Sequence, residues 1–364
     1  MSDNLRRYRA VRKALDQAYP HPPQGHAASR LNTLAALISG IVAAKRTSLP
    51  EIALKVPDQA TVQGRERRYR RFLCNEHVGY DVHFMPFISG LIASLMHRPL
   101  VLVFDGSTVG RGGVTLMASL VYKGRALPLA WLVRTGKKGH FPEALHLELL
   151  AQVRRVLPLE AEVIFLGDGE FDGLGLLEAI EQLAWYYVCR TASNRVLIED
   201  GERFRFDALD VGSESYVSLP SVGYSAQNYG PVHAILWHER RYRKPVYLIT
   251  NMELAQQACW YYRKRFKIET FFSDQKSRGF HIHKSHISDP ARLSRLLLAS
   301  CLAYIWIVYL GTKALREGSY KRIHRSDRCD LSLFQLGLRL LEHLLNEALT
   351  IAVAFAMLPF DDLE

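Results

Sequence analysis

Two short, uninterrupted apolar runs, each closely followed by an aspartate, constrain the fold of this chain most. Residues 100–104 (LVLVF) lead directly into Asp105, and residues 162–166 (EVIFL) are followed by Gly167 and Asp168. Apolar runs of this length without polar alternation are typical of strands buried on both faces of a sheet. A single aspartate after a strand is more often a turn or cap residue. Two of them at neighbouring strand ends indicate a crevice where ligands and catalytic groups gather.

The pattern around these runs predicts an α/β layer with an antiparallel hairpin at one side. Between them we expect strands at 114–122 and 126–133, joined by a turn at 123–125, and then a helix at 142–157. After them we expect a helix at 171–183 and a strand at 185–190. Residues 191–250 contain short β-like runs separated by Gly, Ser, Asn and Pro, which indicates an inserted β region. Helical periodicity resumes over 254–279, and two apolar helices are expected at 290–316 and 331–358.

Residues 1–95 are predicted to form helices and are strongly basic. They hold fourteen lysines and arginines against seven acids, which is +7 of the net charge of +11. One predicted helix, residues 61–73, carries a cluster of arginines: Arg65, Arg67, Arg68, Arg70 and Arg71. A basic helix after a helix and a tight turn resembles the outline of a helix-turn-helix reader of DNA. A solvated helix with scattered salt bridges is the alternative, and the concentration of charge favours DNA.

The sequence pattern gives no indication of export or of a membrane span. Residues 1–13 are polar and arginine-rich, without the apolar segment of a signal peptide. The most apolar stretch, residues 296–310, is shorter than the ~20 residues that a membrane span needs, so a buried helix is expected. The five cysteines form no CxxC pair, which favours a reducing compartment over a disulfide framework or a thiolate zinc site. We expect a cytoplasmic protein.

A third acid, Glu269, lies in a helix-like segment with an aromatic residue and two cations at regular spacing. Relative to Tyr262, the residues Arg265, Glu269 and Lys276 are offset by 3, 7 and 14 positions. At ~100° per residue these offsets fall within an arc of about 60° over ~21 Å of helix. One helix face would then present all four groups in a row. A structural salt-bridged face could have this pattern, but so could a site that holds metal beside phosphate.

The spacing Y-(2)-R-(3)-E-(6)-K of these four residues resembles the signature of bacterial DDE transposases of the insertion-sequence-four family. The segments around the two aspartates resemble the corresponding motifs: Phe104-Asp105-Gly-Ser-Thr108 the hydroxyl-rich first motif, and Asp168-Gly-Glu-Phe-Asp172 the second. The resemblance covers about residues 100–310, including the β insertion between the second aspartate and the glutamate.

The resemblance implies an RNase H-like fold in which Asp105, Asp168 and Glu269 bind two Mg²⁺ ions, with Mn²⁺ as a substitute. Asp105 would bridge the ions, and the other two acids would each complete one side. Oxygen ligands suit hard divalent cations, and two such ions stabilise the attacking and leaving oxygens of an in-line displacement at phosphorus. The resemblance also assigns Tyr262, Arg265 and Lys276 to phosphates of the transposon end. It further implies a hairpin intermediate at each excised end and a homodimer in a synaptic complex.

The chain departs from this family in one motif. Relatives stack a flipped base on a tryptophan just ahead of a strand resembling residues 246–250, where this chain has Val246 and Tyr247. Tyr247 or the upstream Trp237 could serve instead, because any aromatic face can stack on a base. Packing within strands is the alternative for both residues, and we favour it.

Several other polar groups are weaker candidates. Arg134, Lys137 and Lys138 lie in a glycine-flanked loop, where phosphate contact and simple solvation are equally compatible with the sequence. His281, His283 and His286 have no partner cysteines and no helical pairing, so a surface loop near DNA is expected rather than a metal site. Asp172 ranks behind Asp168 as a ligand because it opens the following helix. Residues 110–113 (GRGG) lack the spacing of a phosphate loop, so no nucleotide cofactor is implied.

The sequence therefore predicts a cut-and-paste transposase of α/β class. Its expected parts are a helical DNA-binding domain at 1–95, an RNase H-like core at 96–190 and 251–289, a β insertion at 191–250, and C-terminal helices at 290–364. The first part would recognise terminal inverted repeats, and the core would cleave the ends and join their 3′-hydroxyls to target DNA. The alternatives are a metal-dependent nuclease of the same fold that does not join strands, and an inactive DNA-binding regulator.

Overall fold

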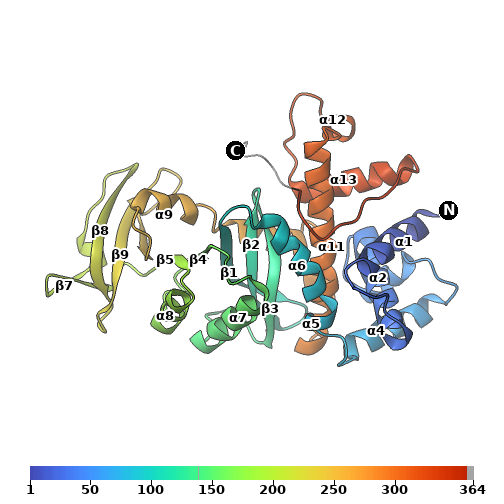
Figure 1. The fold of residues 1–364 in the computed structure, drawn as a ribbon, viewed down its shortest axis with the longest axis horizontal. Coiled ribbons are helices and arrows are strands. Elements are labelled where there is room, and N and C mark those ends of the chain that lie inside the picture. Colours follow the sequence, from blue (N-terminus) through green and yellow to red (C-terminus); the bar gives the residue numbers. More distant parts are fainter. Residues whose placement is uncertain (138, 359–364) are drawn as a thin grey trace.

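A ten-stranded sheet runs through the middle and one end of the molecule, as the computed structural model shows for residues 1–137 and 139–358 (Figure 1). Its strand order is β3-β2-β1-β4-β5-β10-β9-β8-β6-β7. The strands are β1 (Leu100–Val109), β2 (Gly113–Tyr122), β3 (Arg125–Thr135), β4 (Val163–Gly167), β5 (Tyr186–Arg190), β6 (Val196–Glu199), β7 (Glu202–Arg205), β8 (Ser215–Tyr224), β9 (Tyr229–His238) and β10 (Val246–Thr250). The two apolar runs are thus the adjacent strands β1 and β4, and the hairpin predicted after the first is β2–β3.

The register of β1 determines where the sheet opens. Residues Leu100 to Val103 pair in parallel with β4, whereas the strand pairs with β2 in antiparallel fashion from Leu102 to Val109. Beyond Val103, β1 therefore has a neighbour on one side only. The side chains that follow this point, starting with Asp105, lie at the edge where β4 also ends.

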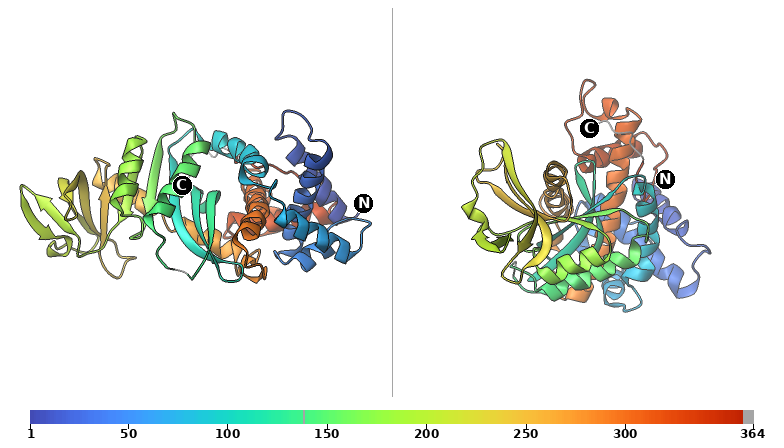
Figure 2. Two further views of the ribbon diagram at one scale, coloured as in Figure 1. Left: turned by 90° about the horizontal axis from the view of Figure 1, so that it is seen from below. Right: turned by 60° about the vertical axis from the view of Figure 1, so that its left-hand side comes forward.

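The strands predicted as an insertion continue the core sheet. β10 pairs in antiparallel fashion with the core strand β5 and, on its other side, with β9. β8 then pairs with β9, and the short strands β6 and β7 close the far end. Figure 2 shows this end of the sheet projecting away from the helices. The insertion is thus joined to the core by main-chain hydrogen bonds.

Helices pack on the sheet and form the opposite end of the molecule. α7 (Glu143–Val156) contacts β2 and β3, α8 (Leu174–Gln182) and α9 (Ala255–Tyr262) contact β5, and α10 (Lys267–Gln275) contacts β1, β2 and β3. The N-terminal helices are α1 (Asp3–Asp16), α2 (Gly25–Ala44), α3 (Leu49–Leu54), α4 (Val62–Cys74), α5 (Tyr80–His83) and α6 (Met85–Leu95). Two 3₁₀ turns are η1 (Phe206–Ala208) and η2 (Ile282–Lys284).

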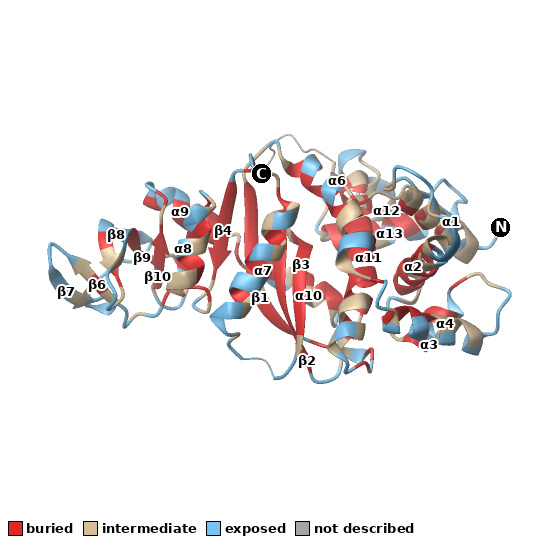
Figure 3. Cartoon of the chain, turned by 60° about the horizontal axis from the view of Figure 1, so that its bottom comes forward, coloured by how far each residue is buried: buried red, intermediate tan, exposed pale blue. Residues whose placement is uncertain are grey.

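The long helix α11 (Pro290–Arg316) joins the two halves of the molecule. It contacts β3 of the sheet, the N-terminal helices α2 and α4, and α13 (Leu333–Asn346); the short helix α12 (Tyr320–Ile323) lies between α11 and α13 in sequence. By length and apolar composition alone, α2 and α11 could cross a membrane, but 83% of the most apolar window of α11 is buried within the protein. Figure 3 shows both helices largely buried. They are core helices, as expected for residues 296–310.

The predicted helix at 331–358 is too long, because α13 ends at Asn346. Ala348 has a left-handed backbone with φ of 53°, which ends the helix. The Arg6 guanidinium donates hydrogen bonds to the carbonyls of Leu344, Leu345 and Leu349, so a side chain from α1 caps the final turn. The apolar residues after this point lie in an extended segment, where Trp306 donates to the Ala352 carbonyl.

The crossing of α11 and α13 requires glycine. A Cβ atom on Gly337 would lie 1.8 Å from the Ile307 carbonyl oxygen, which belongs to helical backbone and cannot move aside. We expect Gly337→Ala to lower the free energy of unfolding by about 3 kcal/mol or more. Gly90→Ala is the control, because Gly90 lies on the exposed side of α6 with no atom within 4 Å of its Cβ position. Thermal unfolding should show the control unchanged or stabilised by up to ~1 kcal/mol. Equal behaviour of the two variants would contradict the close approach.

A buried acid that ties α10 to β3 gives stability a pH dependence. Burial raises the pKa of Asp274 from its ordinary 3.8 to about 6, although Arg125 lies 2.8 Å away and acts in the opposite direction. Between about pH 4 and 6 the folded chain therefore keeps a proton that the unfolded chain has lost, so this group's stabilisation falls as pH rises. A shift of roughly 2 units corresponds to about 3 kcal/mol.

The comparison that isolates this effect is wild type against Asp274→Asn, which cannot titrate. Thermal unfolding from about pH 4 to about pH 7 should show wild type losing up to about 3 kcal/mol relative to the variant. A difference between the two proteins that stays constant with pH would show that Asp274 is ionised throughout.

Candidate active site

Asp105 lies within β1, not just after it as the sequence predicts, but its position relative to β4 is the expected one. The strand continues to Val109 because its second half pairs with β2, while the pairing with β4 stops at Val103. The Asp105 side chain is 17% exposed, and its Oδ1 accepts a hydrogen bond from the Gly106 amide at 2.7 Å. Its other oxygen faces Arg265.

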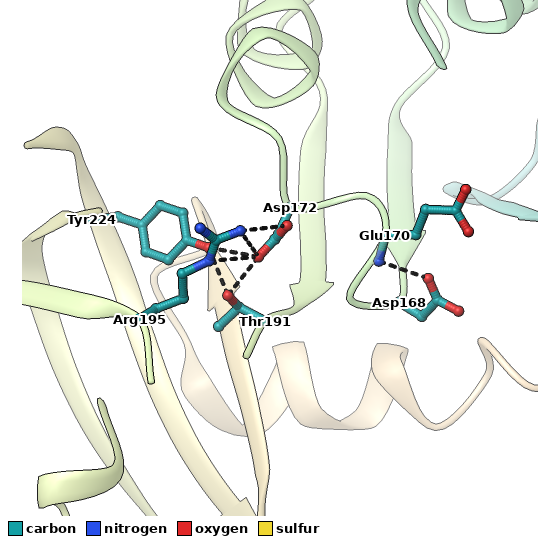
Figure 4. A network of polar contacts seen from close by, with 6 residues as sticks. All are labelled: Asp168, Glu170, Asp172, Thr191, Arg195 and Tyr224. Atoms are coloured by element: carbon teal, nitrogen blue, oxygen red, sulfur yellow. Dashed lines mark hydrogen bonds and ion pairs between the residues drawn. The ribbon is translucent and has the colours of Figure 1, made fainter. Parts of the chain in front are cut away.

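Asp168 follows β4 directly, and its Oδ1 accepts a hydrogen bond from the Glu170 amide at 3.0 Å. Asp172, four residues on, lies on the other side of the same turn (Figure 4). It is buried and accepts hydrogen bonds from Thr191, Tyr224 and Arg195 at 2.6 to 3.2 Å. Asp172 therefore fastens the start of α8 to the far strands of the sheet. This engagement leaves Asp168 as the acid at the end of β4.

The segment that carries Glu269 is not the single straight helix that the spacing predicts. α9 ends at Tyr262 and α10 begins at Lys267, and between them the amides of Lys264 and Arg265 bond to carbonyls three residues back. This tighter winding changes the angular position of every later residue. α10 then ends at Gln275, so Lys276 lies outside the helix. Period arithmetic could not detect this because no Gly or Pro marks the junction.

Arg265 nevertheless brings the three predicted acids together. Its Nη1 lies 3.9 Å from Asp105 Oδ2 and 3.7 Å from Asp168 Oδ2, and its Nη2 lies 3.4 Å from Glu269 Oε1. The arginine side chain is 7% exposed, whereas that of Glu269 is 57% exposed. Carboxylates from β1, the end of β4 and α10 thus surround one buried guanidinium. The resemblance assigns the three acids to metal ions and Arg265 to phosphate; in this DNA-free structure the arginine faces the acids.

The donor set suits a hard divalent cation, although no three acid, histidine or cysteine side chains within 1–137 and 139–358 are close enough to hold one as they lie. All three acids offer oxygen ligands, and all three already face one positive charge. Nε and Nη1 of that guanidinium are buried and have no hydrogen-bond partner among the residues that the structure describes, so the arginine is not closely fitted to them. The carboxylates thus face a common centre that is wider than a metal site.

The other members of the four-residue signature lie around this centre. Lys276 Nζ donates to Ser107 Oγ at 2.7 Å and Thr108 Oγ1 at 3.0 Å, which joins the end of α10 to the hydroxyls that follow Asp105. Tyr262 is buried, and burial raises the pKa of its phenol well above the ordinary value. The phenol therefore stays protonated and can donate a hydrogen bond at any physiological pH.

A loop between β3 and α7 is fastened across this edge by Glu170, a residue that the sequence analysis did not single out. Glu170 Oε1 accepts a hydrogen bond from the Phe141 amide at 2.5 Å. The Phe141 ring in turn covers Gly106, where a Cβ atom would lie 2.5 Å from ring carbon Cε2. Lys137 is exposed on this loop, and Lys138 lies outside the described residues. Arg134, at the end of β3, forms a partly exposed ion pair with Glu148.

A cationic and aromatic cavity of about 520 Å³ adjoins the site at Tyr262 and Phe266. Its remaining lining residues are Arg190, Tyr242, Arg243, Lys244 and Val246. Sequence reasoning missed it, although the run ERRYRK at 239–244 was a signal. Of the two aromatic residues proposed for stacking, Tyr247 packs on Phe206, and Trp237 is 5% exposed between Tyr242 and Arg263.

The arginines of α4 divide into two groups. Arg65 donates to the carbonyls of Ala53 and Asp58, and Arg68 forms an ion pair with the Asp58 side chain, so both connect α4 to α3 and the intervening turn. Arg67 and Arg71 are exposed, and Arg70 is exposed but paired with Glu66. The five side chains therefore do not form one basic surface.

The histidines lie beside this N-terminal part of the molecule. A small cavity of about 210 Å³ is lined by His281, His286, Lys284, Arg46 and residues of α3. Thr47 donates to the His281 carbonyl. The side chain of His283 is not among the lining residues. No metal-binding cluster occurs among them in the described chain.

Residues 97–306 match the family model described as the transposase DDE domain. No curated protein matches the chain. Among solved structures it is similar to the cryo-EM structure of a piggyBac transposase synaptic complex with hairpin DNA, with 11% identity, a TM-score of 0.45, and coverage of 94% of this chain and 78% of that chain. This structural likeness is too low to add to the family match. Because that match includes β1, β4, α10 and most of α11, and more than half of the residues, the chain belongs to the transposase DDE domain family.

Proposed function

We propose that this protein is a cut-and-paste DNA transposase that cleaves the ends of its element and joins them to target DNA. The observation that carries the proposal is the convergence of Asp105, Asp168 and Glu269 on one buried cation. These acids come from three distant segments of the chain, and all three offer carboxylate oxygens as ligands. In a member of the DDE family, they are the catalytic acids we assign.

The assigned carboxylates would hold two Mg²⁺ ions, with Mn²⁺ as a substitute, and the bound ions would supply charge stabilisation for the attacking and leaving oxygens at phosphorus. Asp105 is centrally placed for a bridging role, because it lies on β1 next to the end of β4 and below α10. Asp168 and Glu269 are more exposed, with side chains 32% and 57% accessible, so both can be reached from solvent. An RNase H-like core is supported by the order β3-β2-β1-β4-β5 with β1, β4 and β5 parallel.

Cations and hydroxyls beside the acids would position the phosphate. Lys276 has its ammonium among the Ser107 and Thr108 hydroxyls, a cluster that offers donors to a phosphate oxygen. Tyr262 would donate its retained phenolic proton, and Arg265 its guanidinium, once a phosphate is present. Further contacts to the phosphates of the DNA backbone would come from three cations in this neighbourhood: Arg134, Lys137 and Lys138.

The flanking parts would bind DNA more broadly. Residues 1–95 would recognise the terminal inverted repeats through α4, and residues 290–364 would pack on the core or mediate a homodimer in the synaptic complex. The 191–250 insertion contributes the cavity at Tyr242, which joins three cations to aromatic faces, the combination that accepts an unstacked base. This cavity supports a hairpin route with Tyr242 or Phe266 as the stacking residue in place of Trp237 or Tyr247.

The signature at Tyr262, Arg265, Glu269 and Lys276 supports the further proposal that the protein belongs to the insertion-sequence-four group of bacterial elements. Such a transposase would be cytoplasmic and associated with the nucleoid when bound to DNA.

The direct test replaces each acid by its amide: Asp105→Asn, Asp168→Asn and Glu269→Gln. Each variant should bind an element end with wild-type affinity and lose Mg²⁺-dependent cleavage, because the amide keeps the shape but removes the charge that holds the ion. Glu178→Gln, an exposed acid on α8, is the matched control and should cleave normally. Cleavage retained in all three site variants would show that these acids are not the catalytic ligands, and end binding without any cleavage by wild type would leave the protein as a DNA-binding regulator.

A second assay separates a transposase from a nuclease of the same fold. Pre-cut element ends with free 3′-hydroxyls are incubated with wild-type protein, Mg²⁺ and a supercoiled target plasmid. A transposase converts them to covalent joint products, visible as labelled end co-migrating with plasmid. Cutting of intact ends without any joint product would identify a nuclease.

The two groups of arginines on α4 should respond differently to substitution. Arg67→Ala and Arg71→Ala should weaken DNA binding and each reduce the slope of log affinity against log salt by about 1, without changing the unfolding temperature. Arg65→Ala should instead lower the unfolding temperature, because it leaves the Ala53 and Asp58 carbonyls without their donor. Salt titrations of end binding, together with thermal unfolding, measure both effects. An unchanged salt slope in the first pair would move the DNA-binding surface away from α4.

A further inference from the structure

Arg265 is enclosed by acids yet makes no short hydrogen bond to any of them. Its closest carboxylate contact is 3.4 Å, and the other two are 3.7 and 3.9 Å. Charge-assisted N–H···O bonds normally measure about 2.7–2.9 Å. Nε and Nη1 are buried with no hydrogen-bond partner among the described residues. Nη2 donates one long hydrogen bond, to Glu269 Oε1 at 3.4 Å, so charge attraction contributes more than fitted hydrogen bonds to holding the guanidinium in the described structure.

Two other arginines in this chain, the half-buried Arg125 and the exposed Arg195, are held differently. Arg125 reaches Asp274 at 2.8 Å, and Arg195 makes three bonds of 3.1 to 3.2 Å to Asp172. The contrast shows that this fold can place arginine against carboxylate at bonding distance. Arg265 instead lies with its guanidinium carbon 4.3 Å from the centre of the Phe266 ring, a stacking contact that permits sliding across the ring. Few directional bonds would be broken if it moved.

The positive charge of Arg265 lies on the side of the carboxylates that a metal ion would use. Asp105 and Asp168 each turn one oxygen, Oδ2, toward its Nη1. A divalent ion drawn to Asp105 and Asp168 would approach the same oxygens that Nη1 faces. Two positive charges at such a separation in a shielded site repel strongly. Arg265 in its present position and a divalent ion on these carboxylates are therefore incompatible.

We propose that Arg265 is a displaceable counter-ion that occupies the carboxylate centre in the DNA-free protein and must leave it before a divalent cation can bind. The proposal rests on the proposed function, because it takes Asp105, Asp168 and Glu269 as the metal ligands. It adds a regulatory property of that site: metal affinity is kept low until DNA is present.

The neighbouring cavity explains why DNA would release the arginine. Phe266, on which Arg265 stacks, also lines the cavity of about 520 Å³, so the guanidinium has an adjacent space to enter. Arg190, Arg243 and Lys244 line the same cavity and repel a fourth cation while it is empty of anions. A DNA phosphate there removes this repulsion and offers Arg265 a partner. DNA and divalent cation then bind cooperatively, with Arg265 moving between carboxylate and phosphate.

The test measures Mn²⁺ binding to the full-length protein without DNA, by electron paramagnetic resonance of the free ion. Arg265→Gln should bind Mn²⁺ about tenfold or more tightly than wild type, within the usual range of coupling between sites. Arg265→Lys, which keeps the charge, should bind as weakly as wild type. Arg263→Gln is the matched control, because Arg263 lies two residues away and faces Glu239 and Trp237 instead; it should leave Mn²⁺ affinity unchanged. Circular dichroism confirms that each variant is folded.

A second measurement adds a short blunt-ended duplex. DNA should tighten Mn²⁺ binding to wild type and have much less effect on Arg265→Gln, in which the obstacle is already gone. Mn²⁺ affinity that is equal or weaker in Arg265→Gln than in wild type overturns the counter-ion role. If Mn²⁺ binding to Arg265→Gln persists when Asp105→Asn is added, the carboxylates are not the metal site, and the proposed function fails instead.

Discussion

Mutual repulsion among three carboxylates is the constraint around which this end of the sheet is organised. Asp105, Asp168 and Glu269 stay ionised as neighbours when positive charge lies among them and the elements that carry them are held in place. Arg265 supplies such a charge to all three. The elements are held by bonds remote from the acids: the parallel register of β1 with β4, and the pair between Arg125 and Asp274 that ties α10 to β3. The site is thus maintained by backbone pairing and one buried ion pair.

The parts of the fold that follow from short-range pattern were predictable. Continuous apolar runs identified β1 and β4, because a strand buried on both faces needs apolar residues throughout. The turn at 123–125 identified the β2–β3 hairpin, because a tight reversal of the chain favours particular residues such as glycine. Asp168 follows β4 directly, as expected, whereas Asp105 lies inside β1, because the pairing of that strand with β2 continues to Val109. The preference for Asp168 over Asp172 as a ligand stays a prediction; in the structure Asp172 accepts hydrogen bonds from Thr191, Tyr224 and Arg195.

The features that were missed depend on contacts between distant segments. The helix expected to continue past Asn346 stops where Arg6 caps it. The local sequence near residue 346 carries no signal for this contact, because the arginine comes from the other end of the chain. In the sequence Arg65 and Arg68 belong to the arginine cluster proposed to bind DNA. In the structure both also contact Asp58, which lies in the turn before α4. After Tyr262 the backbone hydrogen bonds change from the i−4 to the i−3 pattern, and no residue type in this segment predicts the change. The tighter winding changes the direction in which Arg265 points, and its side chain faces the carboxylates.

The pairing of β10 with β5 has an evolutionary consequence. The far strands protect the main-chain edge of β5, which would otherwise present unpaired amides and carbonyls to solvent and to other chains. A lineage that shed residues 191–250 would have to cover this border with a new helix, a charged side chain or a proline. Loss of the insertion therefore requires compensating change in the core, whereas growth at the β7 rim, the free margin of the sheet, does not.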